Sequence, residues 1–252
     1  MSAIIQVTNL VKSYGDFRAV DNISFEVNEG EVFGLLGPNG AGKTTTLEII
    51  ETLNKATSGS VFVDGHNVAE EPEAVQTSIG IQLQAAGFYP GLNLLELLEM
   101  FGTMYSTKVD AMAMLKRFNL QEKAKNEYKK LSGGQKQRFS IATTLINHPR
   151  IIFLDEPTTG LDPQARLNLW ELIEEVKKEG VTIVMTTHYM DEAEKLCDRL
   201  AIMDHGKIMQ SGTPNELIDR LLAGGFTPHQ TVKPATLEDV FLDLTGRSLR
   251  ES

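Results

Sequence analysis

The amino-acid sequence predicts an α/β fold with a mainly parallel core sheet, flanking helices, an antiparallel β region at the N-terminus and an inserted helical lobe. Three observations predict it. Apolar strand-like runs alternate with helical runs over most of the chain, a glycine-rich loop joins one such strand to a helix, and the pattern is helical alone at about residues 93–140. Strands of a parallel sheet are buried on both faces, so they read as continuous apolar runs.

The first part of the chain contains most of the expected strands. Two strands of a hairpin-like region, one buried strand, the helix after it and two further strands are expected, in this order, at IIQVTNLVKSYG, FRAVDNISFEVNEG, EVFGLLG, AGKTTTLEIIETL, SGSVFVDG and SIGIQLQ. The run EVFGLLG is short and apolar and ends in glycine, which is typical of a buried strand that leads into a loop.

The second part begins with the helical lobe and then returns to alternation. The lobe is expected to contain the helices LLELLEMFGTMY, VDAMAMLKRFNL and the charged QEKAKNEYKK. After LSGGQ, the expected elements are a long helix, the strand RIIFLDEP, the helix PQARLNLWELIEEVKKEG, the strand VTIVMTTH, the helix MDEAEKLCD and the paired strands RLAIMDHG and KIMQSG. LLAGGFTPHQTVKP is expected to be a connector before a last amphipathic helix, TLEDVFLDL. This alternation favours helices on both faces of the sheet.

Composition narrows the class of protein. The chain has 252 residues, with 34 acidic and 24 basic side chains and a formal net charge of −10. An acidic balance disfavours nucleic acid as the main partner, because binding to phosphates requires clustered Lys and Arg. The N-terminus has no secretory signal pattern, and no run approaches the roughly 20 apolar residues of a membrane span. We therefore expect a cytoplasmic protein that could act at a membrane only through a spanning partner.

The clearest motif is GPNGAGKT, which follows a predicted strand and opens a predicted helix. It matches the phosphate-binding P-loop pattern G-x-x-x-x-G-K-[ST] in the context that this pattern requires. Glycines let successive backbone N–H groups point at one anion, and the helix N-terminus adds its positive dipole. The lysine reaches the β- and γ-phosphates, and the following threonine hydroxyl can bind Mg²⁺. The predicted nucleotide-binding residues are Gly37, Pro38, Asn39, Gly40, Ala41, Gly42, Lys43, Thr44 and Thr45.

Two carboxylates follow the predicted strand RIIFLDEP. Asp155 is expected at the carboxyl end of the strand, where open α/β sheets bind their ligands, and it can hold Mg²⁺ through water. Glu156 comes one residue later and can accept a proton from a water molecule beside the γ-phosphate. A solvated turn is the alternative for such a pair in isolation, but the phosphate loop favours catalysis.

The stretch LSGGQKQR places two glycines where a helix begins. A glycine in a helix costs about 1 kcal/mol relative to alanine, so the pair calls for a reason. Ser132 can cap the helix. Gly133 and Gly134 have no side chains, so their N–H groups can approach an anion closely, and the helix dipole assists. The sequence thus predicts a second anion site on the same chain.

The ordered set of motifs resembles the nucleotide-binding subunits of ATP-binding cassette (ABC) transporters from about residue 4 to residue 247. The set comprises GPNGAGKT, a glutamine after a strand, LSGGQKQR, IIFLDEP, TGLDP and a histidine that ends a strand. In that family two cassettes dock head to tail, and each ATP lies between the phosphate loop of one and the LSGGQ of the other. The resemblance implies that ATP and Mg²⁺ are the cofactors and that Ser132, Gly133, Gly134 and Gln135 contact nucleotide across the dimer.

The resemblance also assigns roles to single residues. It implies that Tyr14 stacks on adenine, that Asp162 contacts the second subunit while capping its own helix, and that His188 touches the γ-phosphate. It implies that Gln84 binds Mg²⁺ and the attacking water. The implied catalytic residues are Glu156, His188, Lys43 and Gln84, and the implied metal ligands are Thr44, Gln84 and Asp155.

The resemblance implies an ATP-hydrolysing subunit that works with a separate integral membrane permease at the inner face of the cell membrane. The segment 87–91 with the helical lobe is expected to face this permease, with ordinary packing as an equal alternative. TLEDVFLDLTGR resembles the C-terminus of exporter cassettes, which favours an exporter over an importer. A soluble ABC-type switch that acts on ribosomes or DNA is a further alternative. We expect a cassette at residues 1–212, including the lobe at about 93–140, and a helical extension at residues 213–252.

Overall fold

The computed structural model describes residues 2–82 and 87–225 and confirms the predicted fold class. A six-stranded sheet has the strand order β10-β9-β3-β8-β7-β6, and a four-stranded antiparallel sheet has the order β2-β1-β4-β5. The strands of the six-stranded sheet are β3 (Val32–Leu36), β6 (Ile79–Gln82), β7 (Ile151–Asp155), β8 (Thr182–Thr187), β9 (Arg199–Asp204) and β10 (Lys207–Gly212). Only the β9–β10 pair in this sheet is antiparallel.

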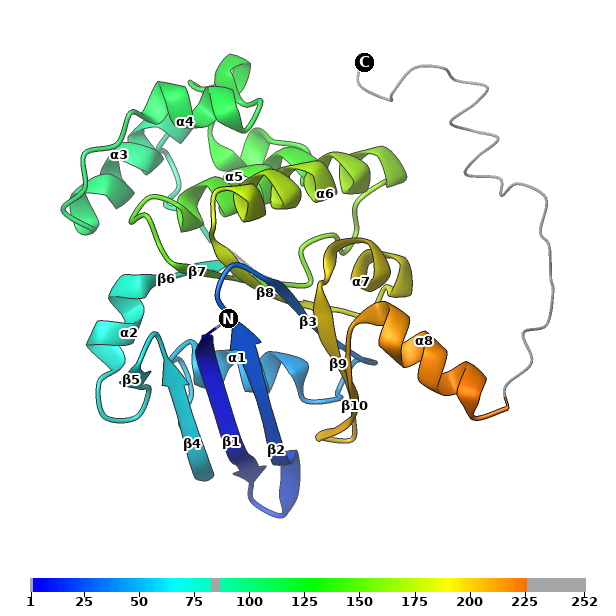
Figure 1. Ribbon diagram of the computed structural model, residues 1–252. Helices are drawn as coiled ribbons and strands as arrows, with labels where there is room; N and C mark the ends of the chain where they lie inside the picture. Colours follow the sequence, from blue (N-terminus) through cyan, green and yellow to red (C-terminus); the bar gives the residue numbers. More distant parts are fainter. Residues whose placement is uncertain (1, 83–86, 226–252) are drawn as a thin grey trace, which may run out of the picture.

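The N-terminal strands form the predicted antiparallel region. Its strands are β1 (Ala3–Tyr14), β2 (Phe17–Asn28), β4 (Ser58–Val63) and β5 (His66–Asn67). β1 and β2 pair as a long hairpin, and β4 pairs with the other edge of β1. Figure 1 shows this sheet below the core sheet, with helix α1 (Lys43–Ile50) between them. The second face of the core sheet is therefore covered by a sheet as well as by helices, and not by helices alone.

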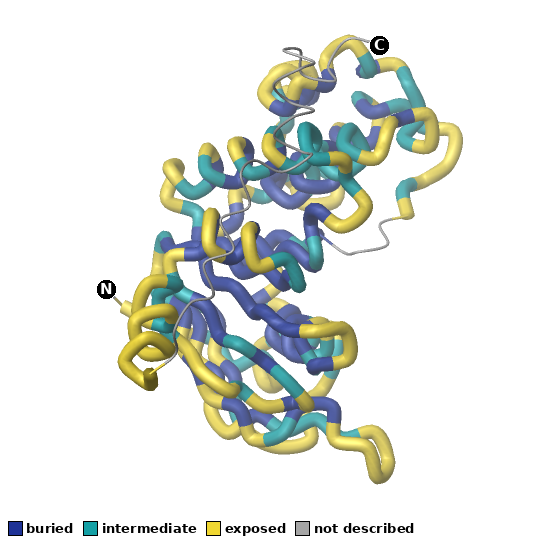
Figure 2. Tube along the Cα trace, turned by 90° about the vertical axis from the view of Figure 1, so that its right-hand side faces the viewer, coloured by how far each residue is buried: buried dark blue, intermediate teal, exposed yellow. Residues whose placement is uncertain are grey.

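Residues of β3 alternate between two hydrophobic cores. Val32 and Leu36 pack into the core beneath α5 (Gly133–Thr144), α6 (Pro163–Lys178) and α7 (Met190–Leu196), whereas Phe33 and Leu35 pack toward α1 and the antiparallel sheet. A strand buried on both faces must be apolar at every position, which explains the continuous apolar runs of the sequence. Figure 2 shows these buried stretches in the middle of the molecule and exposed loops around them.

The helical lobe differs from its prediction at one segment. Helices α3 (Leu94–Met104) and α4 (Ala111–Arg117) are present, but QEKAKNEYKK forms only two short 3-10 turns, Gln121–Lys123 and Tyr128–Lys130. The carbonyls of Ala124 and Asn126 accept hydrogen bonds from Leu95 N and Leu94 N. They thereby satisfy donors in the first turn of α3 that have no partner within their own helix. A continuous helix over this segment would use those carbonyls internally.

Two helices were not predicted as separate elements. One is α2 (Pro72–Ser78), and the other is α8 (Pro214–Ala223), which falls within the helical extension expected at residues 213–252, although its last turn lies in the stretch expected to be a connector. The signal for α8 is nevertheless present in the sequence. Thr213 and Glu216 form a reciprocal capping box, and proline occupies the first helical position. The expected last helix, TLEDVFLDL, lies outside the described residues. In the part of the chain that the structure describes, none of the helices has both the length and the hydropathy of a membrane span.

Candidate nucleotide site

Several parallel strands of the core sheet end along one edge, and this edge carries the predicted site. Leu36 of β3 is in register with Thr187 of β8, and Asp155 of β7 is in register with Thr186. The loop 37–42, Glu156 and His188 directly follow these strand ends. Ligands bind at the carboxyl ends of strands in open α/β sheets. Residues 32–36, 151–155 and 182–187 therefore bring together three motifs that lie far apart in the sequence.

The phosphate loop requires glycine at two positions for different reasons. Gly42, the N-cap residue of α1, has φ +100°, which is a left-handed conformation that side chains disfavour. A Cβ at Gly37 would lie 2.1 Å from the carbonyl oxygen of Met203, and one at Gly42 would lie 2.4 Å from that of Ala19. The loop is therefore pressed against neighbouring backbone. Its curvature is set before any ligand arrives.

The side chain of Lys43 is buried and lies against the phosphate loop. Its Nζ donates hydrogen bonds to the carbonyl oxygens of Gly37, at 2.8 Å, and Pro38, at 3.1 Å, and lies 3.5 Å from Glu156 Oε1. The side chain is 4% exposed. The structure thus places the ammonium group between the loop and the candidate base.

Thr44 and Asp155 form a small cluster of oxygen atoms. The Thr44 hydroxyl lies 3.3 Å from each carboxylate oxygen of Asp155, and the Thr186 hydroxyl donates to Asp155 Oδ1 at 2.5 Å. Oxygen is the donor that Mg²⁺ prefers, and Mg²⁺ commonly takes few protein ligands and keeps several waters. The all-oxygen pair therefore fits Mg²⁺. Gln84, the third predicted ligand, lies outside the described residues.

Glu156 stands at the centre of the site in a constrained conformation. Its φ of +48° is left-handed, and its backbone N–H donates to the Thr186 hydroxyl at 3.0 Å. The Thr159 hydroxyl donates to Glu156 Oε2 at 3.1 Å. His188 Nδ1 lies 3.3 Å from the same oxygen, although this contact lacks hydrogen-bond geometry. Glu156 therefore lies between Lys43 and His188 and contacts both.

An open cavity of about 390 Å³ lies over the loop. It is lined by Tyr14, Phe17, Ala19, Asn39, Gly40, Gly42, Lys43, Thr44, Thr45 and Glu156. Tyr14 is half exposed, accepts a hydrogen bond from Asn54 at 2.7 Å and carries Lys12 Nζ 4.8 Å from its ring centroid. Phe17, which the sequence reasoning did not single out, is 64% exposed on the same rim. A second flat aromatic face near Tyr14 is available to a base.

LSGGQ lines a separate cavity of about 420 Å³. Its lining residues are Ser132, Gly133, Gly134, Gln135, Arg138, Gly160, Leu161, Asp162, Gln164, Ala165 and Asn168. None of them lines the cavity over the phosphate loop. The two predicted anion sites are thus two distinct hollows of one chain, and Asp162 lies with LSGGQ.

The start of α5 is capped as predicted. The Ser132 hydroxyl accepts a hydrogen bond from Gln135 N at 3.4 Å, and Gln135 Oε1 accepts one from Ser132 N at 3.0 Å. Asp162 caps α6 with a single hydrogen bond, in which its Oδ1 accepts from Ala165 N at 2.8 Å. A Cβ at Gly134 would lie 3.1 Å from that of Ala165. One of the two glycines therefore also permits close packing of α5 on α6.

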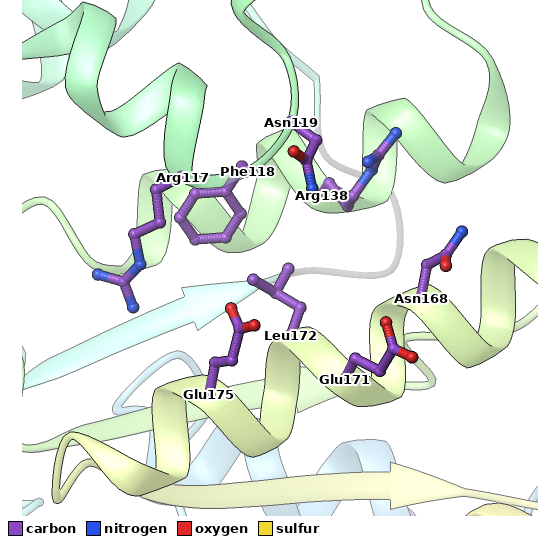
Figure 3. A pocket seen from close by; sticks show the side chains of 8 residues that line it. All are labelled: Arg117, Phe118, Asn119, Arg138, Asn168, Glu171, Leu172 and Glu175. Atoms are coloured by element: carbon purple, nitrogen blue, oxygen red, sulfur yellow. The ribbon is translucent and has the colours of Figure 1, made fainter. Parts of the chain in front are cut away.

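A third cavity, of about 360 Å³, adjoins the LSGGQ cavity at the seam between the lobe and α6. Figure 3 shows its walls, which are built by Arg117, Phe118, Asn119, Arg138, Asn168, Glu171, Leu172 and Glu175. Arg138 and Asn168 line both cavities. Across this seam, Arg117 forms an ion pair with Glu179 at 2.7 Å. The LSGGQ cavity therefore lies beside the junction between the lobe and the core.

The segment 87–91 combines the two expected alternatives. Phe88 is a packing residue, because its ring centroid lies 4.3 Å from that of Tyr128, 5.1 Å from Phe139 and 6.0 Å from Phe101. Tyr89, by contrast, is 63% exposed. Only the second aromatic of this segment is available to a partner.

One buried carboxyl group lies close to the site without belonging to it. Glu51 ends α1 and is 3% exposed. Burial raises the pKa of Glu51 to about 8, and the negative charges of Asp155 and Glu48 add to this shift. A carboxyl group with this pKa holds a proton at neutral pH.

Comparison with known proteins gives a consistent result. The model of the ABC transporter family matches residues 20–159. The chain is 35% identical to Nod factor export ATP-binding protein I of Cupriavidus metallidurans, with 100% of both chains covered. It is 40% identical to linearmycin resistance ATP-binding protein LnrL of Bacillus subtilis, over 89% of this chain and 73% of that one.

Solved structures agree in fold. An ATP-binding subunit of an ABC transporter superposes with a TM-score of 0.77 at 28% identity, covering 96% of this chain and 99% of the other. A dimeric ATP-binding cassette in a post-hydrolysis state, bound to ADP and Pi, superposes with a TM-score of 0.75 at 29% identity, over 83% of this chain and 98% of that one. The family model, the full-length relative and these structures together show that the chain belongs to the ABC transporter family, as one of its ATP-binding, ATPase subunits.

Proposed function

We propose that this chain is the ATPase subunit of an ABC exporter, which closes as a dimer around two ATP molecules and drives a separate transmembrane permease. The observation that carries the proposal is the convergence of Lys43, Glu156 and His188 at one edge of the sheet, with LSGGQ in a second cavity. Export is favoured because relatives across most of the chain act in Nod factor export and drug resistance.

The geometry of the first cavity supports the following mechanism of hydrolysis. Water attacks the γ-phosphorus, the bond from that phosphorus to the β–γ bridging oxygen breaks, and ADP is the leaving group. Glu156 accepts the proton of the attacking water. Lys43 exchanges the carbonyls of Gly37 and Pro38 for phosphate oxygens, and His188 donates to the γ-phosphate. Thr44, Asp155 and Gln84 would hold Mg²⁺, which would neutralise charge on the phosphate oxygens.

The second cavity completes the site of another subunit. Ser132, Gly133, Gly134 and Gln135 present a helix N-terminus to the γ-phosphate held by the partner's phosphate loop, and Asp162 contacts that partner. A surface that carries both halves of a composite site is self-complementary about a twofold axis. ATP then closes the dimer, and its hydrolysis opens it. Tyr14 stacks on the adenine.

The arrangement of the chain serves this cycle. Residues 1–212 form the cassette, with the lobe at about 93–140 inserted, and residues 213–252 form the extension. The lobe contacts the permease, so the subunit sits at the inner face of the membrane. The mechanical step is a change in the distance between two permease contacts as the dimer closes.

Glu156→Gln tests the proposal directly. Glutamine keeps the shape of the side chain and removes its basicity, so ATP is expected to bind and to close the dimer without being cleaved. Size-exclusion chromatography with Mg²⁺-ATP should show a dimer for Glu156→Gln and a monomer for the wild type after turnover. Hydrolysis at the wild-type rate would exclude Glu156 as the base. Co-purification of the tagged wild type with ribosomes, and not with a membrane protein, would exclude the exporter.

A further inference from the structure

Glu192 is a fully buried carboxyl group that the proposed mechanism does not use. It belongs to α7 and is 0% exposed. Its Oε1 accepts a hydrogen bond from Trp170 Nε1 of α6 at 3.3 Å. Burial of a carboxyl group costs free energy, because the group loses its hydration.

The surroundings of Glu192 come from three segments. Burial raises the pKa of Glu192, while the hydroxyls of Thr187 and Thr158, the indole of Trp170 and the charge of Arg166 oppose this shift in part. Glu192 Oε2 and Thr158 Oγ1 are both buried and, in the described part of the chain, neither has a hydrogen-bond partner of good geometry. The carboxyl group thus lies between α6, the loop that follows β7 and the end of β8.

A second link joins the same elements. Arg166 lies four residues before Trp170 and therefore on the same face of α6. Its guanidinium lies 4.8 Å from the ring centroid of Tyr189 and 3.4 Å from the carboxylate of Asp191. The ring of Tyr189 lies 4.1 Å from that of His188. Two consecutive turns of α6 therefore hold the segment that carries His188.

Each of these segments leads to a functional position. α6 begins directly after Asp162, in the LSGGQ cavity. Thr158 lies two residues after Glu156. Thr187 lies next to His188, and its carbonyl oxygen accepts a hydrogen bond from Gly37 N at 3.3 Å. Glu192 lies close to all three of these segments.

We propose that Glu192 is a positioning residue that ties α6 to the His188 segment, so that the placement of Asp162 against a second subunit sets the placement of His188 over the γ-phosphate. This inference rests on the proposed function. Glu192 does not line the cavity over the phosphate loop, so its role is one of position. Its polar contacts fix the relative orientation of the segments that they join, because hydrogen bonds are directional and apolar packing is not. A displacement of about 1 Å at a catalytic group can cost a factor of about 100 in rate.

The test compares three single variants by steady-state ATPase kinetics, expressed per folded subunit. Glu192→Leu removes the polar contacts and keeps an apolar volume. Glu192→Gln keeps the shape and the acceptor for Trp170. Glu194→Leu makes the same chemical change at an exposed position of the same helix and serves as the control. We expect Glu192→Leu to lower kcat at least about 10-fold with KM for ATP within about 3-fold, and Glu192→Gln and Glu194→Leu to stay within about 3-fold of the wild type.

Trp170 provides an independent readout, because it is the only tryptophan of the chain. Glu192→Leu removes the acceptor of the Trp170 indole N–H, so the maximum of the tryptophan fluorescence emission should shift. Glu192→Gln should leave this maximum in place. If Glu192→Leu does not fold, Trp170→Phe tests the proposal in its place, because phenylalanine keeps an aromatic ring and removes the N–H that donates to Glu192. We expect Trp170→Phe to lower kcat by about 3- to 10-fold with KM unchanged.

The outcomes separate this inference from the proposed function. Wild-type kcat in Glu192→Leu, or in Trp170→Phe if Glu192→Leu does not fold, would overturn the positioning role. An equal loss in Glu192→Gln and Glu192→Leu would also overturn it, because the role then requires charge and not hydrogen-bond direction. If the wild type and Glu194→Leu show no ATPase activity at all, the proposed function fails instead.

Discussion

At the scale of single residues, the charged groups of the nucleotide site satisfy one another before ATP binds. Lys43 is held by two loop carbonyls and by Glu156, and Glu156 is held in turn by Thr159 and lies against His188. A buried charge needs such partners, since leaving it unpaired costs several kcal/mol. Binding of ATP therefore exchanges one set of partners for another. The left-handed backbone of Glu156 is held by the hydrogen bond from its N–H to the Thr186 hydroxyl.

The buried carboxyl group of Glu51 makes the free energy of unfolding depend on pH. The pKa of its buried carboxyl group is raised to about 8 from its ordinary value of 4.5. The folded state thus holds this proton more tightly than the unfolded state. The stabilising contribution is complete below about pH 4.5 and is lost as the pH rises through about 8, with a slope of at most about 1.4 kcal/mol per pH unit.

Glu51→Gln should remove this slope, because an amide has no proton to lose. The difference in free energy of unfolding between Glu51→Gln and the wild type should grow in favour of the variant between pH 5 and pH 8. Urea titrations at several pH values, without nucleotide or Mg²⁺, would measure it. Glu73→Gln, at an exposed position, is the control and should show no such trend. A constant difference for Glu51→Gln across this range would contradict the assignment.

At the scale of secondary-structure elements, the two glycines of LSGGQ are not equivalent. A Cβ at Gly133 would meet nothing closer than Leu161 at 3.8 Å, an ordinary contact, whereas one at Gly134 would lie 3.1 Å from Ala165. Gly134 thus serves the packing of α5 on α6 as well as the cavity. Gly133 serves the cavity alone.

Gly133→Asp should separate stability from dimerisation. An acidic side chain in the first turn of a helix interacts favourably with the helix dipole, by about 0.3–1 kcal/mol, so the melting temperature should not fall. The same charge should repel the γ-phosphate and prevent the ATP-dependent dimer of Glu156→Gln, while ADP binding to the single subunit persists. Gly134→Ala should instead lower the melting temperature, because we expect the cost of the close contact with Ala165, about 1–3 kcal/mol, to exceed the gain in helix propensity of at most about 1 kcal/mol. Chromatography and thermal denaturation measure the two effects, and loss of ADP binding in Gly133→Asp would contradict the separation of the two cavities.

The segment 87–91 offers another matched pair. Tyr89→Ala should leave ATP hydrolysis and stability unchanged and weaken co-purification with the membrane subunit, because Tyr89 is exposed. Phe88→Ala should lower stability by about 2–4 kcal/mol, since its ring packs against three aromatic neighbours. The measurements are the yield of the complex from solubilised membranes and a denaturant midpoint. Equal yields for wild type and Tyr89→Ala would place the permease contact elsewhere.

Comparison of sequence and structure shows which features local patterns can reveal. The strand ends at Leu36, Asp155 and Thr187 could be placed because each buried strand is an apolar run that ends in a motif. The segment QEKAKNEYKK could not, because its carbonyls are taken by the first turn of α3. The role of Glu192 was also hidden, because its neighbours meet only after three distant segments pack together.

At the scale of the whole molecule, most of the chain fixes the position of two cavities relative to each other, the one over the phosphate loop and the one lined by LSGGQ. The core sheet holds the phosphate loop, and α5 and α6 hold LSGGQ and Asp162. The α6–α7 contacts through Trp170 and Glu192 join the two regions. Sequence motifs predicted some of the residues that line each cavity. Their separation into two cavities with no residue in common is a property of the fold.

This separation has a consequence that mixing experiments can detect. Lys43→Ala damages only the first hollow, and Ser132→Arg damages only the second, so each variant alone should be inactive. A mixed dimer, however, combines the intact phosphate loop of one chain with the intact LSGGQ of the other and so regains one of its two sites. Random pairing makes half of all dimers mixed, so an equimolar mixture should recover about one quarter of wild-type ATPase activity. Lys43→Ala with Glu156→Gln damages the same hollow twice and should recover nothing. Two inactive proteins would thus restore each other, as two recessive mutations do when they complement.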